Sequence, residues 1–142
     1  MAIIALISCG KDKLSFAAKA RYLYTGDLFT KTLKYTETIL KPYKIFILSA
    51  KHGLLKLDKE IEPYDETLKD KRRDEQKEWA NNVLHQLGKE CDVKNDNFII
   101  LAGADYYQDL IKHLPNVDIH FKKLKFGQRL QFLKRKLNGQ LL

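Results

Sequence analysis

Two short segments carry most of the side chains that are able to do chemistry, and each directly follows an apolar run. Residues 8–13 read S-C-G-K-D-K, and residues 49–53 read S-A-K-H-G. Hydroxyls, a thiol, an imidazole and lysines at such short spacing can supply a nucleophile, an acid–base group and contacts to phosphate. These two segments are therefore the first candidates for a functional site.

The first segment combines small residues with cations. Gly10 allows a ligand to approach the backbone closely, and Ser8, Lys11 and Lys13 can bind a phosphate or a carboxylate. The segment is not a P-loop, because the pattern G-x-x-x-x-G-K-[ST] is absent. Cys9 has two interpretations: a nucleophile activated by the nearby lysines, or a small buried residue at the end of a strand.

The second segment places a hydroxyl, a cation, an imidazole and a glycine within five residues of a buried strand. Ser49 and His52 are suited to hydrogen bonding or to acid–base catalysis, and Lys51 to holding a phosphate. Gly53 permits a turn that other residues resist. The alternative is a structured loop, in which Ser49 caps backbone amides and the imidazole is solvated.

Residues 61–68 form an extended lead into the next helix, because Pro63 restricts the residue before it. We expect Tyr64 and Asp65 to fold back over the mouth of the pocket. If the reaction is glycosidic, the Asp65 carboxylate would stabilise an oxocarbenium-like transition state or activate water. The alternative is that Asp65 or Thr67 serves only as a helix N-cap.

A third candidate segment follows another apolar run and contains Gly103 and Tyr106. A glycine between a strand and a helix lets a ligand approach the helix N-terminus, where unpaired N–H groups favour anions. The ring of Tyr106 or of its neighbour Tyr107 can stack on a base or a sugar. We expect this segment to line the same pocket.

Positive charge is concentrated near the end of the chain. The formal net charge is +8, and residues 112–142 contain eight lysines and arginines against one aspartate. Such clustering attracts polyanions, so we expect Lys122, Lys123, Lys125 and Arg129 to contact nucleic acid or a nucleotide-like anion. The alternative is an ordinary lysine-rich surface.

The elements that must position these residues follow from the apolar pattern. The predicted strands are residues 2–7, 44–48, 97–102 and 117–121. The first three are nearly continuous apolar runs, which indicates burial on both faces of a sheet. Helical patterns cover residues 16–24, 27–41, 69–87, 105–114 and 127–137, with Asp27 and Asp105 as N-caps and Gly88 as a terminator. The sequence predicts one Rossmann-like α/β domain over residues 1–142: a three-layer sandwich with a mainly parallel sheet of four strands or slightly more. Ligands of such sheets bind at the carboxyl ends of the strands.

Composition excludes several classes of protein. The apolar N-terminal run is too short to span a membrane and lacks the features of a signal peptide, so we expect a cytoplasmic protein without a membrane partner. Cys9 and Cys91 form neither a disulfide framework nor a zinc-binding pair. No metal or other cofactor is expected, and the sequence does not indicate an oligomeric state.

Several of these segments together resemble a small domain family of uncharacterised function in bacteria and phages. Its pattern is I-S-C-x-K, L-Y-x-x-x-L-F, I-L-S-A-K-Y-G-L-L, P-Y-D-x-T-L and L-A-G-x-x-Y. The matching segments are residues 7–11, 23–29, 47–55, 63–68 and 101–106. His52 stands where tyrosine is usual in the pattern.

The chain also resembles, more distantly, the YaaA family of peroxide-stress proteins. That family carries L-S-x-x-Y-G-x-L followed by I-x-P-Y, and I-S-P-A-K where residues 7–11 read I-S-C-G-K. YaaA-type proteins are associated with DNA binding, although this chain has no evident counterpart of their helix-hairpin-helix element. The resemblance implies a nucleic-acid- or nucleotide-directed enzyme, with base-glycosidic hydrolysis or transfer as the expected reaction. The alternative is a non-catalytic DNA- or RNA-binding protein.

Overall fold

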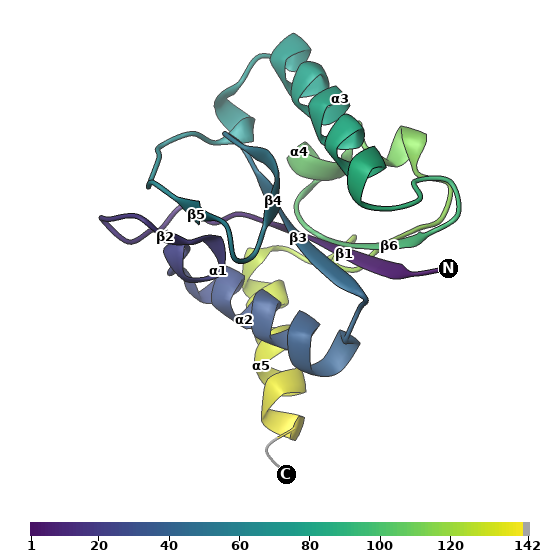
Figure 1. Ribbon diagram of the computed structural model, residues 1–142. Helices are drawn as coiled ribbons and strands as arrows, with labels where there is room; N and C mark the ends of the chain where they lie inside the picture. The colour runs from purple at the N-terminus through teal and green to yellow at the C-terminus, as the bar shows by residue number, and fades with distance from the viewer. Residues whose placement is uncertain (141–142) are drawn as a thin grey trace.

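A five-stranded, mostly parallel sheet forms the centre of the protein, as a computed structural model that describes residues 1–140 shows (Figure 1). The strand order is β4-β3-β1-β6-β7. The parallel strands are β1 (Ile3–Ser8), β3 (Lys44–Ser49), β6 (Asn97–Leu101) and β7 (Val117–Ile119). β4 (Gly53–Lys56) returns antiparallel to β3 at one edge. The predicted α/β class and all four predicted strands are confirmed.

β1 is the central strand of the sheet, and both of its faces are covered. Ile4 and Leu6 face one side of the sheet, Ala5 and Ile7 face the other, and all four are fully buried. Successive side chains of a strand point to opposite faces, so a strand buried on both sides needs an unbroken apolar run. The sequence of β1 therefore predicts burial on both faces, but the similar apolar runs of β3 and β6 leave the central position to be shown by the structure.

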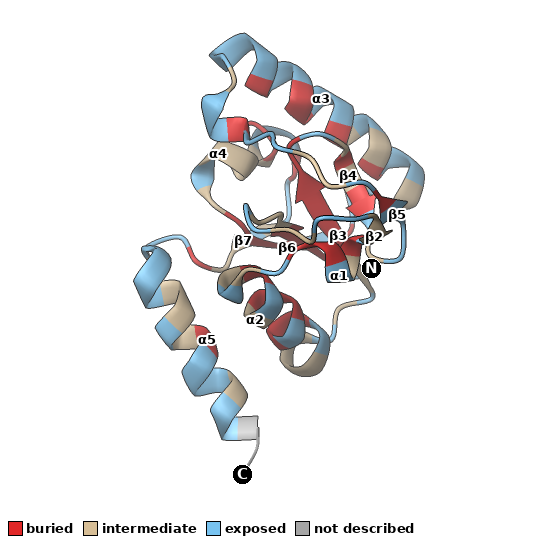
Figure 2. Ribbon diagram, turned by 90° about the vertical axis from the view of Figure 1, so that its left-hand side faces the viewer, coloured by how far each residue is buried: buried red, intermediate tan, exposed pale blue. Residues whose placement is uncertain are grey.

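Helices cover the two faces of the sheet as separate layers, with the buried residues between them (Figure 2). One layer holds α3 (Arg73–Glu90), α4 (Ala104–Tyr107) and the 3₁₀ turns η2 (Leu68–Asp70) and η3 (Ile111–His113). The opposite layer holds α1 (Ala20–Leu23), α2 (Asp27–Tyr35) and α5 (Phe126–Gln140). Among residues 1–140, no helix combines the length and the apolar character that a membrane crossing requires.

The expected helix over residues 16–24 is mostly replaced by other structure. Only α1 is helical there, and it follows a two-residue strand, β2 (Ala18–Lys19), paired antiparallel with β5 (Glu60–Ile61). The backbone amides of Ala20 and Arg21 donate to the carbonyls of Lys59 and Leu57, at 2.8 and 2.9 Å. These contacts join segments about 40 residues apart, which no local pattern in the sequence reveals.

Three of the expected helix boundaries are wrong. Gly26, not Asp27, is the N-cap of α2, and Gly103, not Asp105, is the N-cap of α4; each aspartate lies in the first turn instead. Acidic side chains in a first turn stabilise the helix through its dipole, so their presence alone does not fix the boundary. Gly88 lies inside α3, which continues to Glu90.

A tertiary contact holds the end of α3, whereas α2 ends through changes in its own backbone. Lys44 Nζ on β3 donates to the carbonyl of Glu90 at 2.7 Å, which satisfies a group that a helix end leaves unpaired. Beyond Tyr35, α2 continues as a π-helical segment, η1 (Thr36–Leu40). Lys41, in the left-handed region with a φ of 48°, then turns the chain before Pro42.

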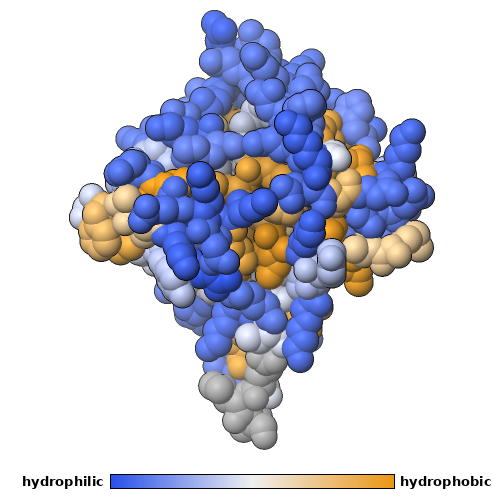
Figure 3. Space-filling model, viewed as in Figure 1, coloured by the Kyte–Doolittle hydropathy of each residue, from blue (hydrophilic) through white to orange (hydrophobic). Residues whose placement is uncertain are grey.

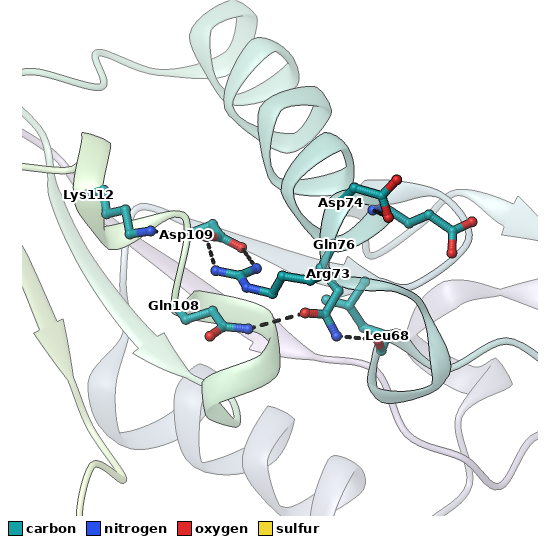
Figure 4. Close-up of polar contacts among 8 residues, drawn as sticks. Leu68, Arg73, Asp74, Gln76, Gln108, Asp109 and Lys112 are labelled. Atoms are coloured by element: carbon teal, nitrogen blue, oxygen red, sulfur yellow. Dashed lines mark hydrogen bonds and ion pairs between the residues drawn. The ribbon is translucent and has the colours of Figure 1, made fainter.

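An ion pair fixes the start of α3 to the segment that follows β6 (Figure 4). The Arg73 guanidinium donates to both carboxylate oxygens of Asp109, at 2.6 and 2.7 Å, and Lys112 Nζ lies 3.3 Å from the same group. Arg73 holds the pKa of Asp109 down at about 2. This clamp fixes the segment between α4 and η3, directly after Tyr106.

Candidate functional site

A cavity of about 390 Å³ opens at the carboxyl ends of β1 and β6 and is here called the strand-end cavity. Its volume lies in the range of roughly 300–1,000 Å³ that is usual for small-molecule sites. Its position is the one expected for ligands of open parallel sheets. Its lining residues are Ser8, Cys9, Gly10, Lys11, Asp12, Gly26, Asp27, Leu28, Phe29, Thr32, Leu101, Phe121, Phe126 and Arg129.

Backbone pairing holds the loop after β1 against the start of α2. The Cys9 amide donates to the carbonyl of Leu48 at 3.0 Å, which extends the β1–β3 pairing by one residue. Further along, the Thr25 amide donates to the Asp12 carbonyl at 2.9 Å. Asp12 therefore lies beside Gly26, where a Cβ atom would sit 3.7 Å from the Asp12 carboxylate.

The cavity lining contains two cations, Lys11 and Arg129, and two carboxylates, Asp12 and Asp27. The Asp27 carboxylate pairs with Lys31 one turn along α2, at 3.3 Å. The Asp12 carboxylate has no ion pair or side-chain hydrogen bond within residues 1–140. The lining is therefore balanced in formal charge, and it presents one unpaired carboxylate.

Aromatic side chains form part of the wall of the strand-end cavity. Phe29 and Phe121 are buried, whereas the ring of Phe126 is 61% exposed. Arg129 lies over the ring of Phe121, at 5.8 Å from its centroid, and its Nε donates to the carbonyl of Leu124 at 2.9 Å. Such a wall offers a flat, apolar contact of the kind that planar heterocycles use.

A cluster of hydroxyls lies behind the loop after β1 and is here called the hydroxyl cluster: Tyr24, Ser49, Tyr64 and Tyr106, around the thiol of Cys9. Tyr64 Oη lies 2.5 Å from Tyr24 Oη and 2.7 Å from Ser49 Oγ. Tyr106 Oη lies 3.4 Å from Cys9 Sγ. Cys9 thus connects the strand-end cavity, which it lines, to this cluster.

The phenols of the hydroxyl cluster remain protonated at neutral pH. Burial raises the pKa of Tyr24 to about 12. Burial likewise raises the pKa values of Tyr64 and Tyr106 far above the ordinary tyrosine value, and a negative charge on Cys9 would raise them further. These groups can therefore donate hydrogen bonds but cannot serve as ionised bases.

Ser49 acts on the backbone and on Tyr64. It is fully buried, its Oγ accepts a hydrogen bond from the His52 amide at 3.0 Å, and its carbonyl accepts one from Trp79 Nε1 at 2.8 Å. Ser49 is not part of the cavity lining. The structure therefore shows the backbone-capping arrangement that was the alternative interpretation of this residue.

Lys51 and His52 line a different hollow, of about 550 Å³, on the side of β4 and β5. Figure 3 shows apolar surface in the middle of this face, framed by hydrophilic side chains. Burial, and next the charge of Lys51, lower the pKa of His52, so its imidazole is neutral at pH 7. Gly53 has a φ of 71°, which confirms that this turn requires a glycine.

Asp65 is exposed on the segment that precedes η2, and it has no side-chain hydrogen bond or ion pair within residues 1–140. Its neighbour Tyr64 does fold back onto the strand ends, where Lys13 Nζ lies over the Tyr64 ring at 4.5 Å from the centroid. Neither residue lines the strand-end cavity. Thr67 precedes η2 without a side-chain capping bond.

The basic residues near the end of the chain have two different environments. Lys122, Lys123 and Lys125 are exposed on the connection between β7 and α5. Arg129 is partly buried and lines the cavity, and its Nη1 would lie 3.9 Å from a Cβ atom at Gly103. Gly103 and Arg129 therefore meet at the end of β6, although they are 26 residues apart.

Residues that sequence reasoning missed include Asp12, Asp27, Phe121 and Phe126. Asp12 lies within the lysine-containing segment after β1, and the two phenylalanines lie on either side of Lys122, Lys123 and Lys125. Aromatic residues interleaved with cations are a usable signal for a ligand surface. Within the described part of the chain, no three His, Cys, Asp or Glu side chains gather as a metal site.

Comparison with known proteins gives a family and nothing more specific. Neither the curated proteins nor the solved structures contain a match to this chain. One family model matches residues 4–135, which include every residue of the strand-end cavity and of the hydroxyl cluster. The chain therefore belongs to the family of unknown function DUF6884.

Proposed function

We propose that this protein is an enzyme that acts on a nucleotide-like substrate at the bond between base and sugar, as a hydrolase or a transferase. The observation that carries the proposal is the strand-end cavity, whose lining combines the unpaired Asp12 carboxylate with aromatic rings and Arg129. The motif resemblance to the DNA-associated YaaA family supports the same class of substrate.

The residues of the cavity suit the charges that develop when a glycosidic bond breaks. The bond from the sugar carbon to the base nitrogen opens through an oxocarbenium-like transition state, which a carboxylate stabilises. We assign this role to Asp12, which lines the cavity and would also accept a proton from an attacking water molecule or acceptor hydroxyl. The departing base takes the bonding electron pair, and the nearby charges of Lys11 and Arg129 stabilise it.

Asp12 takes the role that the sequence alone suggested for Asp65. Both carboxylates are exposed and unpaired within residues 1–140, but Asp12 lines the strand-end cavity and Asp65 does not. A carboxylate must reach the reacting carbon directly or through one water molecule. The geometry therefore favours Asp12.

The test is to measure release of free base, by liquid chromatography and mass spectrometry, from nucleosides, nucleoside monophosphates and short oligonucleotides. We expect release by the wild type and a loss of roughly 100-fold or more in Asp12→Asn, in line with the effect of removing an acid–base group. Asp65→Asn is the matched control and should keep full activity. If the wild type releases no base, the proposed reaction is refuted, and loss in Asp65→Asn alone would transfer the role to that residue.

A second candidate function is non-catalytic binding of DNA or RNA. The observation that favours it is the exposure of Lys122, Lys123 and Lys125 on one connection. It predicts binding that weakens steeply with salt, disappears when these lysines become glutamates, and is unaffected by Asp12→Asn. Base release by the wild type would contradict this candidate as the whole function.

A further inference from the structure

The connection between β7 and α5 contributes to the wall of the strand-end cavity and is also a basic surface segment. Phe121 on this connection and Phe126, the first residue of α5, line the cavity. Lys122, Lys123 and Lys125 lie between them in the sequence, and all three are exposed. The three basic residues therefore adjoin two lining residues of the cavity along the chain.

The charges of this region are divided between the inside and the outside of the cavity. Inside, the carboxylates Asp12 and Asp27 balance Lys11 and Arg129. Outside, the three lysines form no ion pair within the described residues, so their charge is uncompensated. A neutral base and its sugar match the balanced interior, whereas phosphate groups match the lysines.

The ring of Phe126 lies at the junction of these two regions. It is 61% exposed, although it also lines the cavity. An exposed aromatic ring beside cations is the usual arrangement for stacking a base while the backbone lies on the charges. Phe126 is therefore suited to hold the base next to the one that enters the cavity.

We propose that the substrate of the strand-end cavity is a nucleotide within a single-stranded polynucleotide, and this inference rests on the proposed function. The reacting base occupies the cavity, and the adjoining phosphates lie along Lys122, Lys123 and Lys125. A base can enter such a cavity only after it leaves its stack, which costs least in a single strand. DNA and RNA share this chemistry, and the experiment distinguishes them.

The test is fluorescence anisotropy with 12-nucleotide single strands of DNA and of RNA, and with a DNA duplex. We expect single strands of at least one sugar type to bind about 10-fold or more tightly than the duplex. In the triple variant K122E/K123E/K125E we expect single-strand affinity to fall by at least 10-fold. The slope of log binding constant against log salt concentration should become shallower by about two in this variant. Each phosphate contact on a single strand contributes about 0.7 to that slope, and three lysines are removed.

The matched control is the triple variant K69E/K77E/K89E, which makes the same change of charge on η2 and α3. These three lysines are also exposed and unpaired within residues 1–140. The control should bind single strands with nearly wild-type affinity. Phe126→Ala should lose roughly 5- to 100-fold in affinity, the usual effect of removing one stacking ring, and Phe126→Tyr should restore it.

Thermal shift with free nucleosides separates this inference from the proposed function. We expect nucleosides to stabilise the wild type and K122E/K123E/K125E equally, because the lysines lie outside the cavity. Equal loss of single-strand binding in both triple variants, or equal affinity for duplex and single strand, would overturn the inference. In that case nucleoside binding and base release would still support the proposed function, and absence of both would refute it.

Discussion

The ion pair between Arg73 and Asp109 allows a quantitative prediction about folding. Asp109 lies on the segment after Tyr106, and its side chain is 11% exposed while that of Arg73 is 45% exposed. Replacing Asp109 by Asn keeps the size of the side chain but removes the charge that both guanidinium nitrogens contact. We expect this change to lower the free energy of unfolding at neutral pH.

The magnitude follows from the pKa of Asp109. In the folded protein this pKa is about 2, and the ordinary value for aspartate is about 3.9. The difference corresponds to an upper limit of roughly 2.5 kcal/mol, which solvent around the half-exposed Arg73 reduces to roughly 1–2 kcal/mol. Because the folded-state pKa is the lower one, this stabilisation is present above pH 4 and is lost as the pH falls toward 2.

The assay is urea denaturation of the wild type and Asp109→Asn at pH 7 and at pH 3. We expect the variant to be less stable by roughly 1–2 kcal/mol at pH 7, and about half of that difference to disappear at pH 3. Asp58→Asn is the control, because Asp58 forms an exposed pair with Arg21 at 3.2 Å and should change stability by less than about 0.5 kcal/mol. A deficit that is the same at both pH values would refute the electrostatic explanation.

Three further changes test other parts of the structure by the same denaturation assay. Gly53→Ala should lower the free energy of unfolding by roughly 1–3 kcal/mol, because φ is 71° and the new Cβ would lie 2.5 Å from Gln86 Oε1. An unchanged urea midpoint would contradict this expectation. Ser49→Ala should cost roughly 1–3 kcal/mol, because the His52 amide loses its partner and Tyr64 keeps only Tyr24. No loss of stability would show that water replaces the hydroxyl. Burial lowers the pKa of His120, which forms a hydrogen bond with Tyr35. The unfolded chain therefore binds a proton at this histidine more readily than the folded protein, so wild-type stability should fall as the pH drops below about 6.5. That fall should be smaller in His120→Asn, and an equal fall would assign it to other groups.

The parallel strands could be predicted because each is a local pattern with one physical cause. β1, β3 and β6 are apolar runs, since neighbouring strands and two helical layers exclude water from them. β4 has only four residues, and β2 and β5 have two each, so they carry no periodicity. These strands form through pairing with distant segments, which the local sequence does not encode.

The candidate site was predicted in part for a related reason. Ser8 ends the central strand and Cys9 and Lys11 follow it, so they would line a strand-end site on either side of this strand. Whether Ser49 or Arg129 joins them depends on which side of β1 the cavity opens. Ser49 ends β3 and Gly103 follows β6, on opposite sides of β1. The cavity opens on the β6 side, a consequence of strand order and of the packing of α5 that the sequence pattern did not determine.

The most direct test of the account is to locate the ligand on the protein by amide NMR. Titration of ¹⁵N-labelled protein with each nucleoside, and then with a short single strand, would report where the amide signals move. We expect the changes to concentrate at residues 8–12, 26–29 and 121–129, which contain most of the residues that line the strand-end cavity. Two results would contradict binding at the strand-end cavity. One is a set of changes confined to the hollow beside β4, at Lys51, His52 and their neighbours. The other is the absence of changes with all of these ligands.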